Sequence, residues 1–308
     1  MIGDLIKNKG FNINMDSDGI LSFLFLKLGG FNNKITGFNT SSDIILSAHN
    51  LLNKVWDDVF IDIFVQNKNT VSFDNHVVLY HPTKINFNKL NPNILIEEHF
   101  ANSHESYRNK YPLSTNIFIL SLLEKEKLIT KRINSSNLVK IGTNINLYDM
   151  ILRADGVLNT FCGKYRGNVV NWFEKLISYS NSGANIISLF EYLSSLTFEE
   201  IKRKNNAIEN FYRTYGLTKD GGYNRSISIK DNVYLLNNIM RSFADYLGVE
   251  LNETKNTYHI YEGIVGEGEK VMDLTSLDTY AFVKNNQYLK YTMNFKITNK
   301  REDLTTYD

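Results

Sequence analysis

The sequence has little cysteine and little net charge, and each shortage excludes a class of protein. Its one cysteine, Cys162, can form neither an intramolecular disulfide nor a thiolate zinc cluster, so we expect a reducing compartment, the cytoplasm. Lysine and arginine number 34 against 33 aspartate and glutamate, which gives a formal net charge of +1. A chain this close to neutrality has no global field that attracts nucleic acid or an anionic membrane. An anionic ligand must therefore be held by a local site.

Long apolar segments are also missing. The longest one, Ile20–Leu28, contains Ser22 and Lys27 and is much shorter than the roughly 20 residues that a membrane-spanning helix needs. The first residues, MIGDLIKNKG, include Asp4 and lead into no apolar run, so we expect neither a secretory signal nor a transit peptide. The sequence therefore predicts no contact with the membrane interior.

The 308 residues are enough for two domains, and 43% of them are hydrophobic. In the N-terminal part, strand-like and helix-like segments alternate. Alternating apolar residues predict a strand at 11–15, a turn follows at Asp16–Gly19, and Ile20–Leu28 predicts a buried helix that ends at Gly29. Further strands are predicted at 34–38, 59–65 and 70–73, with a helix after Ser41–Asp43. This order predicts an α/β fold, a parallel sheet with helices on both faces.

Helical patterns dominate the middle of the chain, and a second α/β pattern follows them. Helices are predicted at 116–127, 147–158, 168–179 and 197–215, the last of them polar over much of its surface. Farther along, strands are predicted at 232–236, 257–261, 279–283 and 288–295, a helix at 242–247 and a hairpin turn at 285–286. We therefore predict a first domain at 1–195, a helical connector at 196–215 and a smaller mixed α/β domain at 216–308.

Acidic side chains fall at the ends of the predicted strands. Asp16 and Asp18 follow the first strand, and their spacing can direct both carboxylates into one space if the chain is still extended there. Asp62 lies in a strand that is otherwise apolar, and Asp74 and His76 end the fourth strand. Ligands of open α/β sheets bind outside the carboxyl ends of the strands. Because crowded carboxylates repel unless protons or divalent cations neutralise them, this pattern predicts a site for Mn²⁺ or Mg²⁺.

Two simpler interpretations of the first acidic segment are available. A calcium-binding EF-hand loop that starts at Asn14 fits Asp16, Asp18 and Gly19, but its twelfth position is then Phe25, which supplies no carboxylate. A plain surface turn leaves Asp62 unexplained. The metal site is therefore the interpretation that covers all of these residues.

Three segments resemble a known family in order and spacing. NMDSDGILS, VFIDIF and SFDNHVV are similar to motifs one to three of the DHH phosphoesterase superfamily. That superfamily includes RecJ-type exonucleases, oligoribonuclease-like enzymes, cyclic di-AMP phosphodiesterases and exopolyphosphatases. Asn91-Pro92 and the segment PLSTNIFIL also resemble the family's course after motif three. Near the C-terminus, VYLLNN, SFADYL, DTYAFV and YLKYTMNF resemble the small domain that grips substrate in this family.

The resemblance implies a metal-dependent hydrolase. It implies two Mn²⁺ or Mg²⁺ ions that activate water for attack on a phosphodiester, in short oligonucleotides, single-stranded nucleic acid or nucleotide second messengers. A homodimer is compatible with it. Carried over by position, the metal ligands are Asp16, Asp18, Asp62 and Asp155, with Asp149 as the alternative fourth acid, and the catalytic residues are Asp74 and His76, the latter contacting the phosphate.

The chain also departs from the family pattern. Asn12 stands four residues before Asp16, where the family commonly has histidine, and Asn75 replaces the middle residue of the Asp-His-His signature. No glycine-rich substrate loop follows YTMNF. These substitutions favour a second hypothesis, a degenerate module that binds nucleotide or nucleic acid, or scaffolds a complex, without hydrolysis.

Overall fold

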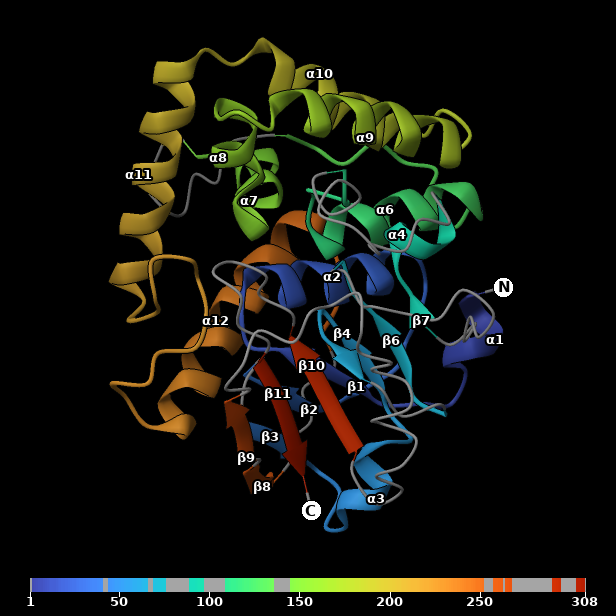
Figure 1. The fold of residues 1–308 in the computed structure, drawn as a ribbon, viewed down its shortest axis with the longest axis vertical. Helices are drawn as coiled ribbons and strands as arrows, with labels where there is room; N and C mark the ends of the chain where they lie inside the picture. The colour runs from blue at the N-terminus through green and yellow to red at the C-terminus, as the bar shows by residue number, and fades with distance from the viewer. Residues whose placement is uncertain are drawn as a thin grey trace. The chain divides into compact units, whose positions relative to one another are not determined.

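The computed structural model divides into two compact units, each assembled from segments that are far apart in the sequence (Figure 1). The first unit comprises residues 1–14, 33–111 and 254–308, and the second comprises 15–32 and 112–253. The residues that the structure describes are 2–40, 44–65, 69–75, 89–96, 109–135, 145–251, 257–262, 264–267, 290–294 and 303–307.

The first unit contains a mostly parallel seven-stranded sheet. Its strands are β1 (Phe11–Asn14), β2 (Ile35–Asn39), β3 (Ile44–Ser47), β4 (Val59–Ile61), β6 (Val71–Phe73), β7 (Lys89–Leu90) and β8 (His259–Glu262). They lie in the order β7-β6-β4-β1-β2-β3-β8, and only the β2/β3 and β3/β8 pairs are antiparallel. All four residues of β1 are buried, as expected for a strand with parallel neighbours on both sides. The predicted α/β class and mostly parallel sheet are confirmed.

A second, antiparallel sheet also belongs to the first unit. It contains β5 (Phe64–Val65), β9 (Ile264–Glu267), β10 (Lys290–Asn294) and β11 (Asp303–Tyr307), in the order β5-β10-β11-β9. The described helices of this unit are short, namely α1 (Ile2–Ile6), α3 (Leu52–Val55) and α4 (Pro92–Leu95). One apolar core cluster of the unit is formed by Ile45, Val55, Trp56, Phe60, Ile63 and Val65.

The described part of the second unit consists of helices and their connections. They are α2 (Ser17–Leu28), α6 (Thr115–Lys125), α7 (Leu147–Arg153), the 3₁₀ turn η3 (Ala154–Gly156), α8 (Val157–Cys162), α9 (Arg166–Tyr179), α10 (Ala184–Ser195), α11 (Phe198–Thr214) and α12 (Ile229–Leu247). Helix α2 is buried over its first ten residues, Ser17–Leu26, and packs against both α6 and α12. Helices α9 and α10 lie side by side (Figure 1), and Phe173 stacks on Phe190 with ring centroids 5.2 Å apart. Within the described residues, no helix combines the length and apolarity that crossing a membrane requires.

The predicted strand at 59–65 is wrong as a single element. Strand β4 ends at Ile61, and Phe64 and Val65 then join the antiparallel sheet as β5. The break falls on Asp62, whose φ of 62° lies in the left-handed region that an extended strand cannot contain. The apolar segment 59–65 thus contributes to two different sheets, and the chain passes from one to the other at Asp62.

Two further predicted elements are corrected by tertiary structure. The segment after Ser41–Asp43 is not a helix, because Ile44–Ser47 pairs with β2 and β8 as strand β3. The predicted strand at 232–236 lies inside α12, whose buried residues Leu236, Met240 and Phe243 follow helical spacing. The predicted strand at 279–283, the turn at 285–286 and His76 lie outside the described residues. The domain boundaries at 195 and 216 stay a prediction.

Candidate metal centre

The carboxyl ends of β1, β4 and β6 bring polar residues to one edge of the parallel sheet. Ile61 is in register with Ile13 on one side and with Phe73 on the other. The residues that follow are Asn14, Asp62 and Asp74, and the two aspartates are only 2% and 1% exposed. Asp62 donates its backbone N–H to the carbonyl of Phe73 at 2.8 Å, and Asn14 Nδ2 donates to Asp62 Oδ2 at 2.9 Å. The strand-end acids of the first unit therefore meet at one edge, as the sequence predicts.

Asn12 and Asn75, the two asparagines that the resemblance places opposite histidines, are both buried. Asn12 Oδ1 accepts a hydrogen bond from Asn39 Nδ2 at 2.9 Å, whereas Asn12 Nδ2 has no partner among the described residues. A Cβ at Gly37 would lie 2.5 Å from that Nδ2, so glycine makes room for the amide. Asn75 is 8% exposed, and its carbonyl accepts from Asn93 Nδ2 at 3.1 Å.

In the second unit, Asp16 and Asp18 lie at the start of α2. Asp16 is the N-cap residue, with an extended backbone and with Oδ1 accepting from Gly19 N at 2.9 Å. Asp18 is already inside the helix and is 1% exposed. The chain is therefore not extended across both residues, and both side chains nevertheless line the same pocket.

The carboxylate of Asp18 is held by the first turn of α6. Its Oδ2 accepts from Thr115 N and its Oδ1 from Asn116 N, each at 2.8 Å. Ser114, the N-cap residue of α6, makes no side-chain capping bond. Because N–H groups at a helix N-terminus lack partners within the helix, a carboxylate there is stabilised by two hydrogen bonds and by the helix dipole.

The two candidates for the fourth acid differ sharply in environment. Asp149 is fully buried, and its Oδ1 accepts from Tyr192 Oη at 2.6 Å while its Oδ2 accepts from Lys204 Nζ at 2.7 Å. Asp155 is exposed and lies on η3 with a φ of 52°. The hydrogen bonds of Asp149 thus join α7 to α10 and α11. Asp155 instead lines the same pocket as Asp16 and Asp18.

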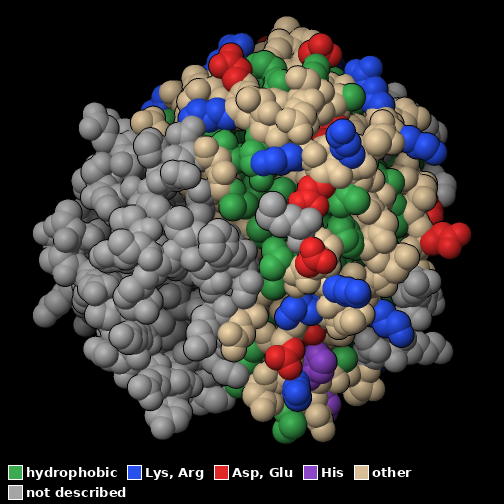
Figure 2. Space-filling model, turned by 90° about the vertical axis from the view of Figure 1, so that its right-hand side faces the viewer, with side chains coloured by type: hydrophobic (Ala, Val, Ile, Leu, Met, Phe, Trp, Pro, Cys, Tyr) green, Lys and Arg blue, Asp and Glu red, His purple; other side chains and the backbone are tan. Residues whose placement is uncertain are grey.

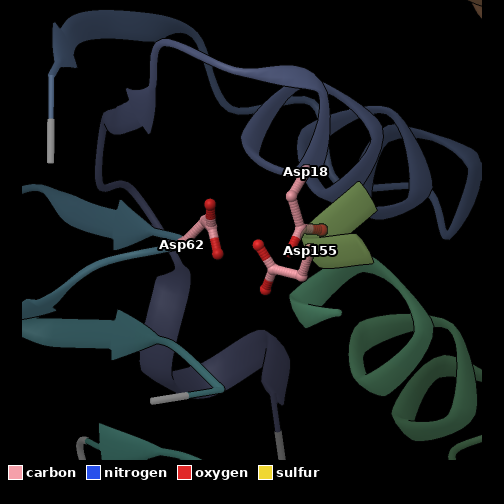
Figure 3. A group of neighbouring side chains, drawn as sticks. All are labelled: Asp18, Asp62 and Asp155. Atoms are coloured by element: carbon pink, nitrogen blue, oxygen red, sulfur yellow. The ribbon is translucent and has the colours of Figure 1, made fainter. Parts of the chain in front are cut away.

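Three acidic side chains form a group that can bind a metal ion. Asp18, Asp62 and Asp155 each offer one carboxylate oxygen, and these oxygens lie within 4.8 Å of one another (Figure 3). Asp16, a predicted ligand, is not part of this group. Asp62 and Asp155 both have positive φ, a conformation that costs a non-glycine residue about 1–2 kcal/mol. Strained backbone of this kind is common at functional sites.

The pocket beside Asp18 has a volume of about 340 Å³ and belongs wholly to the second unit. Its charged lining comprises Asp16, Asp18, Asp155, Asp220 and Arg153. On the described part of the face in Figure 2, by contrast, basic and acidic side chains are interspersed, in keeping with the small net charge. The concentration of acid in this pocket is therefore a local feature.

Burial dominates the electrostatics of Asp18. Its pKa is raised well above the ordinary value by desolvation, and the negative charges of Asp155 and Asp16 raise it further. The hydrogen bonds from Asn116 N and Thr115 N act in the opposite direction without cancelling the rise. A cation at this position would reverse the balance, because it stabilises the ionised carboxylates that now repel one another.

This arrangement predicts how stability depends on pH in EDTA. Because the pKa of Asp18 is raised on folding, the folded protein binds more protons than the unfolded chain between the ordinary aspartate pKa, about 3.9, and the raised value. The free energy of unfolding should fall as pH rises through that window. Asp155→Asn removes one repelling charge and is expected to raise the free energy of unfolding at neutral pH by about 0.2–1 kcal/mol, measured by urea denaturation. Asp231→Asn, at an exposed position of α12, is the control; an equal gain there would contradict the prediction.

A second prediction concerns the Asp220–Gly222 loop that borders the pocket. Gly221 has a φ of +75°, and a Cβ there would lie 2.6–2.8 Å from ring atoms of buried Tyr212. Gly221→Ala is expected to lower the free energy of unfolding by about 2–4 kcal/mol, because overpacking adds to left-handed strain. Gly248→Ala tests strain alone, since its φ is +66° with no atom within 4 Å of the added Cβ. Equal losses for the two variants in urea denaturation would exclude the steric contribution.

Comparison with known proteins identifies no relative. No protein-family model matches the chain, and searches of curated proteins and of solved structures also gave no match. The resemblance to the DHH superfamily therefore stays a prediction.

Proposed function

We propose that this protein is a metal-dependent phosphoesterase. It hydrolyses phosphodiester bonds in short oligonucleotides, single-stranded nucleic acid or nucleotide second messengers, with Mn²⁺ or Mg²⁺, and it acts in the cytoplasm. The observation that carries the proposal is the group of Asp18, Asp62 and Asp155 with oxygens within 4.8 Å of one another. The order of the acidic motifs along the sequence supports the same activity.

The donor set fits a hard divalent cation. Carboxylate oxygens are the ligands that Mg²⁺ and Mn²⁺ prefer, and no thiolate competes in a chain whose one cysteine is Cys162. Asp18, Asp62 and Asp155 would hold one ion, and Asp16, which lines the adjacent pocket, is available to a second. When bound, such ions activate water, orient the phosphate and neutralise the charge that develops during displacement.

The chain's own residues hold the proposed ligands in position. Two backbone N–H groups of α6 fix the carboxylate of Asp18, and the amide of Asn14 donates to Asp62. Hydrogen bonds of this kind orient the ligands of a metal ion and increase the affinity for the metal. Asp74 ends the strand beside β4, and we propose that it acts in catalysis together with His76.

The test is hydrolysis by purified protein with Mn²⁺ and a panel of dinucleotides, cyclic dinucleotides, single-stranded DNA and polyphosphate. We expect turnover of at least one phosphodiester and a loss of at least about 100-fold in kcat for Asp62→Asn, because removing a charged group that acts on the transition state costs several kcal/mol. Asp57→Asn, whose side chain is 68% exposed, is the matched control. No turnover by the wild type, or equal rates for both variants, would contradict the proposal.

A second candidate is a binding module without hydrolysis. It is favoured by Asn12, which occupies a family histidine position and whose oxygen accepts from Asn39. An amide binds Mn²⁺ less strongly than imidazole, so a site of this composition can hold fewer ions. Anomalous scattering at the manganese edge discriminates the two, because two bound ions favour the enzyme and one or none favours the module.

A further inference from the structure

Arg153 is a buried cation at the wall of the acidic pocket. It is the last residue of α7, lines the pocket with Asp18 and Asp155, and has a side chain only 5% exposed. Its Nη2 group donates to Asp220 Oδ1 at 2.8 Å, with longer contacts of 3.4 Å to Glu209 Oε1 and to the carbonyl of Lys219. The guanidinium is thus held from one side.

The guanidinium has further N–H donors on Nε and Nη1. Among the described residues, no acceptor contacts Nε, which is buried, and none contacts Nη1. Of the five N–H donors of arginine, the three on these two nitrogens therefore lack a partner in the described part of the chain. Leaving donors of a buried charged group without a partner costs stability, which an anionic ligand would offset by accepting from them.

The two carboxylates that contact Arg153 do not prevent it from binding an anionic ligand. The side chains of Asp220 and Glu209 are 60% and 30% exposed, so solvent screens both ion pairs. In the pocket itself, the charges of Asp16, Asp18 and Asp155 oppose an anion until divalent cations neutralise them. With cations bound, Arg153 supplies the remaining positive charge at the wall.

We propose that Arg153 is a phosphate-binding residue, whose Nη1 group donates to a non-bridging oxygen of a phosphate beside the metal ions. This inference rests on the proposed function and adds a residue that the sequence motifs do not indicate. A guanidinium suits the role because its planar donors match phosphate oxygens and its charge does not titrate in proteins. The pocket volume of about 340 Å³ suits a small phosphorylated ligand and is at the lower end for ligand sites.

The experiment measures binding of inorganic phosphate to Mn²⁺-loaded protein by calorimetry, with bound Mn²⁺ counted by electron paramagnetic resonance. We expect Arg153→Gln to weaken phosphate affinity at least about 10-fold at unchanged Mn²⁺ occupancy, and Arg153→Lys to retain part of the affinity. Glu209→Gln breaks the ion pair without altering the pocket lining and should leave phosphate affinity within about twofold. Arg213→Gln, exposed on α11, is the control.

The outcomes separate this inference from the proposed function. Unchanged phosphate affinity in Arg153→Gln with Mn²⁺ bound overturns the role of Arg153 alone. Equal weakening by Arg153→Gln and Glu209→Gln also overturns it, because a merely structural ion pair predicts that result. Absence of Mn²⁺ binding by the wild type overturns both. If Arg153→Gln does not fold, as judged by circular dichroism, Arg153→Lys and Glu209→Gln decide by the same comparison.

Discussion

Asp149→Ala is expected to lower the free energy of unfolding by about 3–5 kcal/mol, with or without divalent cations. Asp149 is fully buried and accepts hydrogen bonds from Tyr192 Oη, Lys204 Nζ and Asn146 N. Its removal leaves the ammonium of Lys204, 14% exposed, without its partner, and removes an acceptor from helices α7, α10 and α11 together. Burial raises the pKa of Tyr192, which disfavours ionisation of its phenol in place of the lost carboxylate. Urea denaturation measures the loss.

The comparison for this prediction is Asp231→Ala on α12. Asp231 is exposed and is engaged with Ser228 at the helix start, so its removal should cost no more than about 1 kcal/mol. A double-mutant cycle with Lys204→Met isolates the ion pair. The double variant is expected to lose less free energy of unfolding than the sum of the two single losses, because neither charge is then left without its partner. A loss below about 1 kcal/mol for Asp149→Ala would contradict the structural role of this residue.

Mn²⁺ is expected to stabilise the wild type much more than Asp155→Asn. At a free Mn²⁺ concentration 100 times the Kd, binding to the folded state alone adds about 2.7 kcal/mol to the free energy of unfolding. For domains of 150–250 residues this corresponds to a rise in Tm of roughly 5–10 °C. Asp155 contributes one of the three oxygens that lie within 4.8 Å of one another, so its replacement should remove most of the rise. Thermal unfolding with Mn²⁺ and with EDTA measures both states.

The sign of the change in stability distinguishes Asp155 from Asp149, the two candidates for the fourth acid. Asp155→Asn should be more stable than the wild type in EDTA and less stable in Mn²⁺, because the same carboxylate repels Asp18 and binds the cation. Asp149→Ala should be less stable in both. An equal Mn²⁺-dependent rise in Tm for the wild type and Asp155→Asn would exclude Asp155 as a ligand. Asp57→Asn should follow the wild type throughout.

Local sequence patterns predicted much of the fold because they report on short-range geometry. The alternation at 11–15 and the apolar run at Ile20–Leu28 correspond to β1 and α2, and the amphipathic segment at 168–179 corresponds to α9. The predictions failed where pairing decided the conformation. Ile44–Ser47 is a strand because β2 and β8 flank it, and β8 comes from residues more than 200 positions away.

The sequence by itself determined that acidic residues follow β1 and β6 and that Asp62 interrupts an apolar segment, because the position of a residue along the chain is a local property. Only the tertiary structure decided between Asp155 and Asp149, since the difference lies in which side chains surround each carboxylate. It also assigned the cap of α6 to Asp18, which is 97 residues from Thr115 in sequence. Hydrogen-bond partners at such separations leave no periodic signal along the chain, so the environment of each acid emerges only when the helices pack.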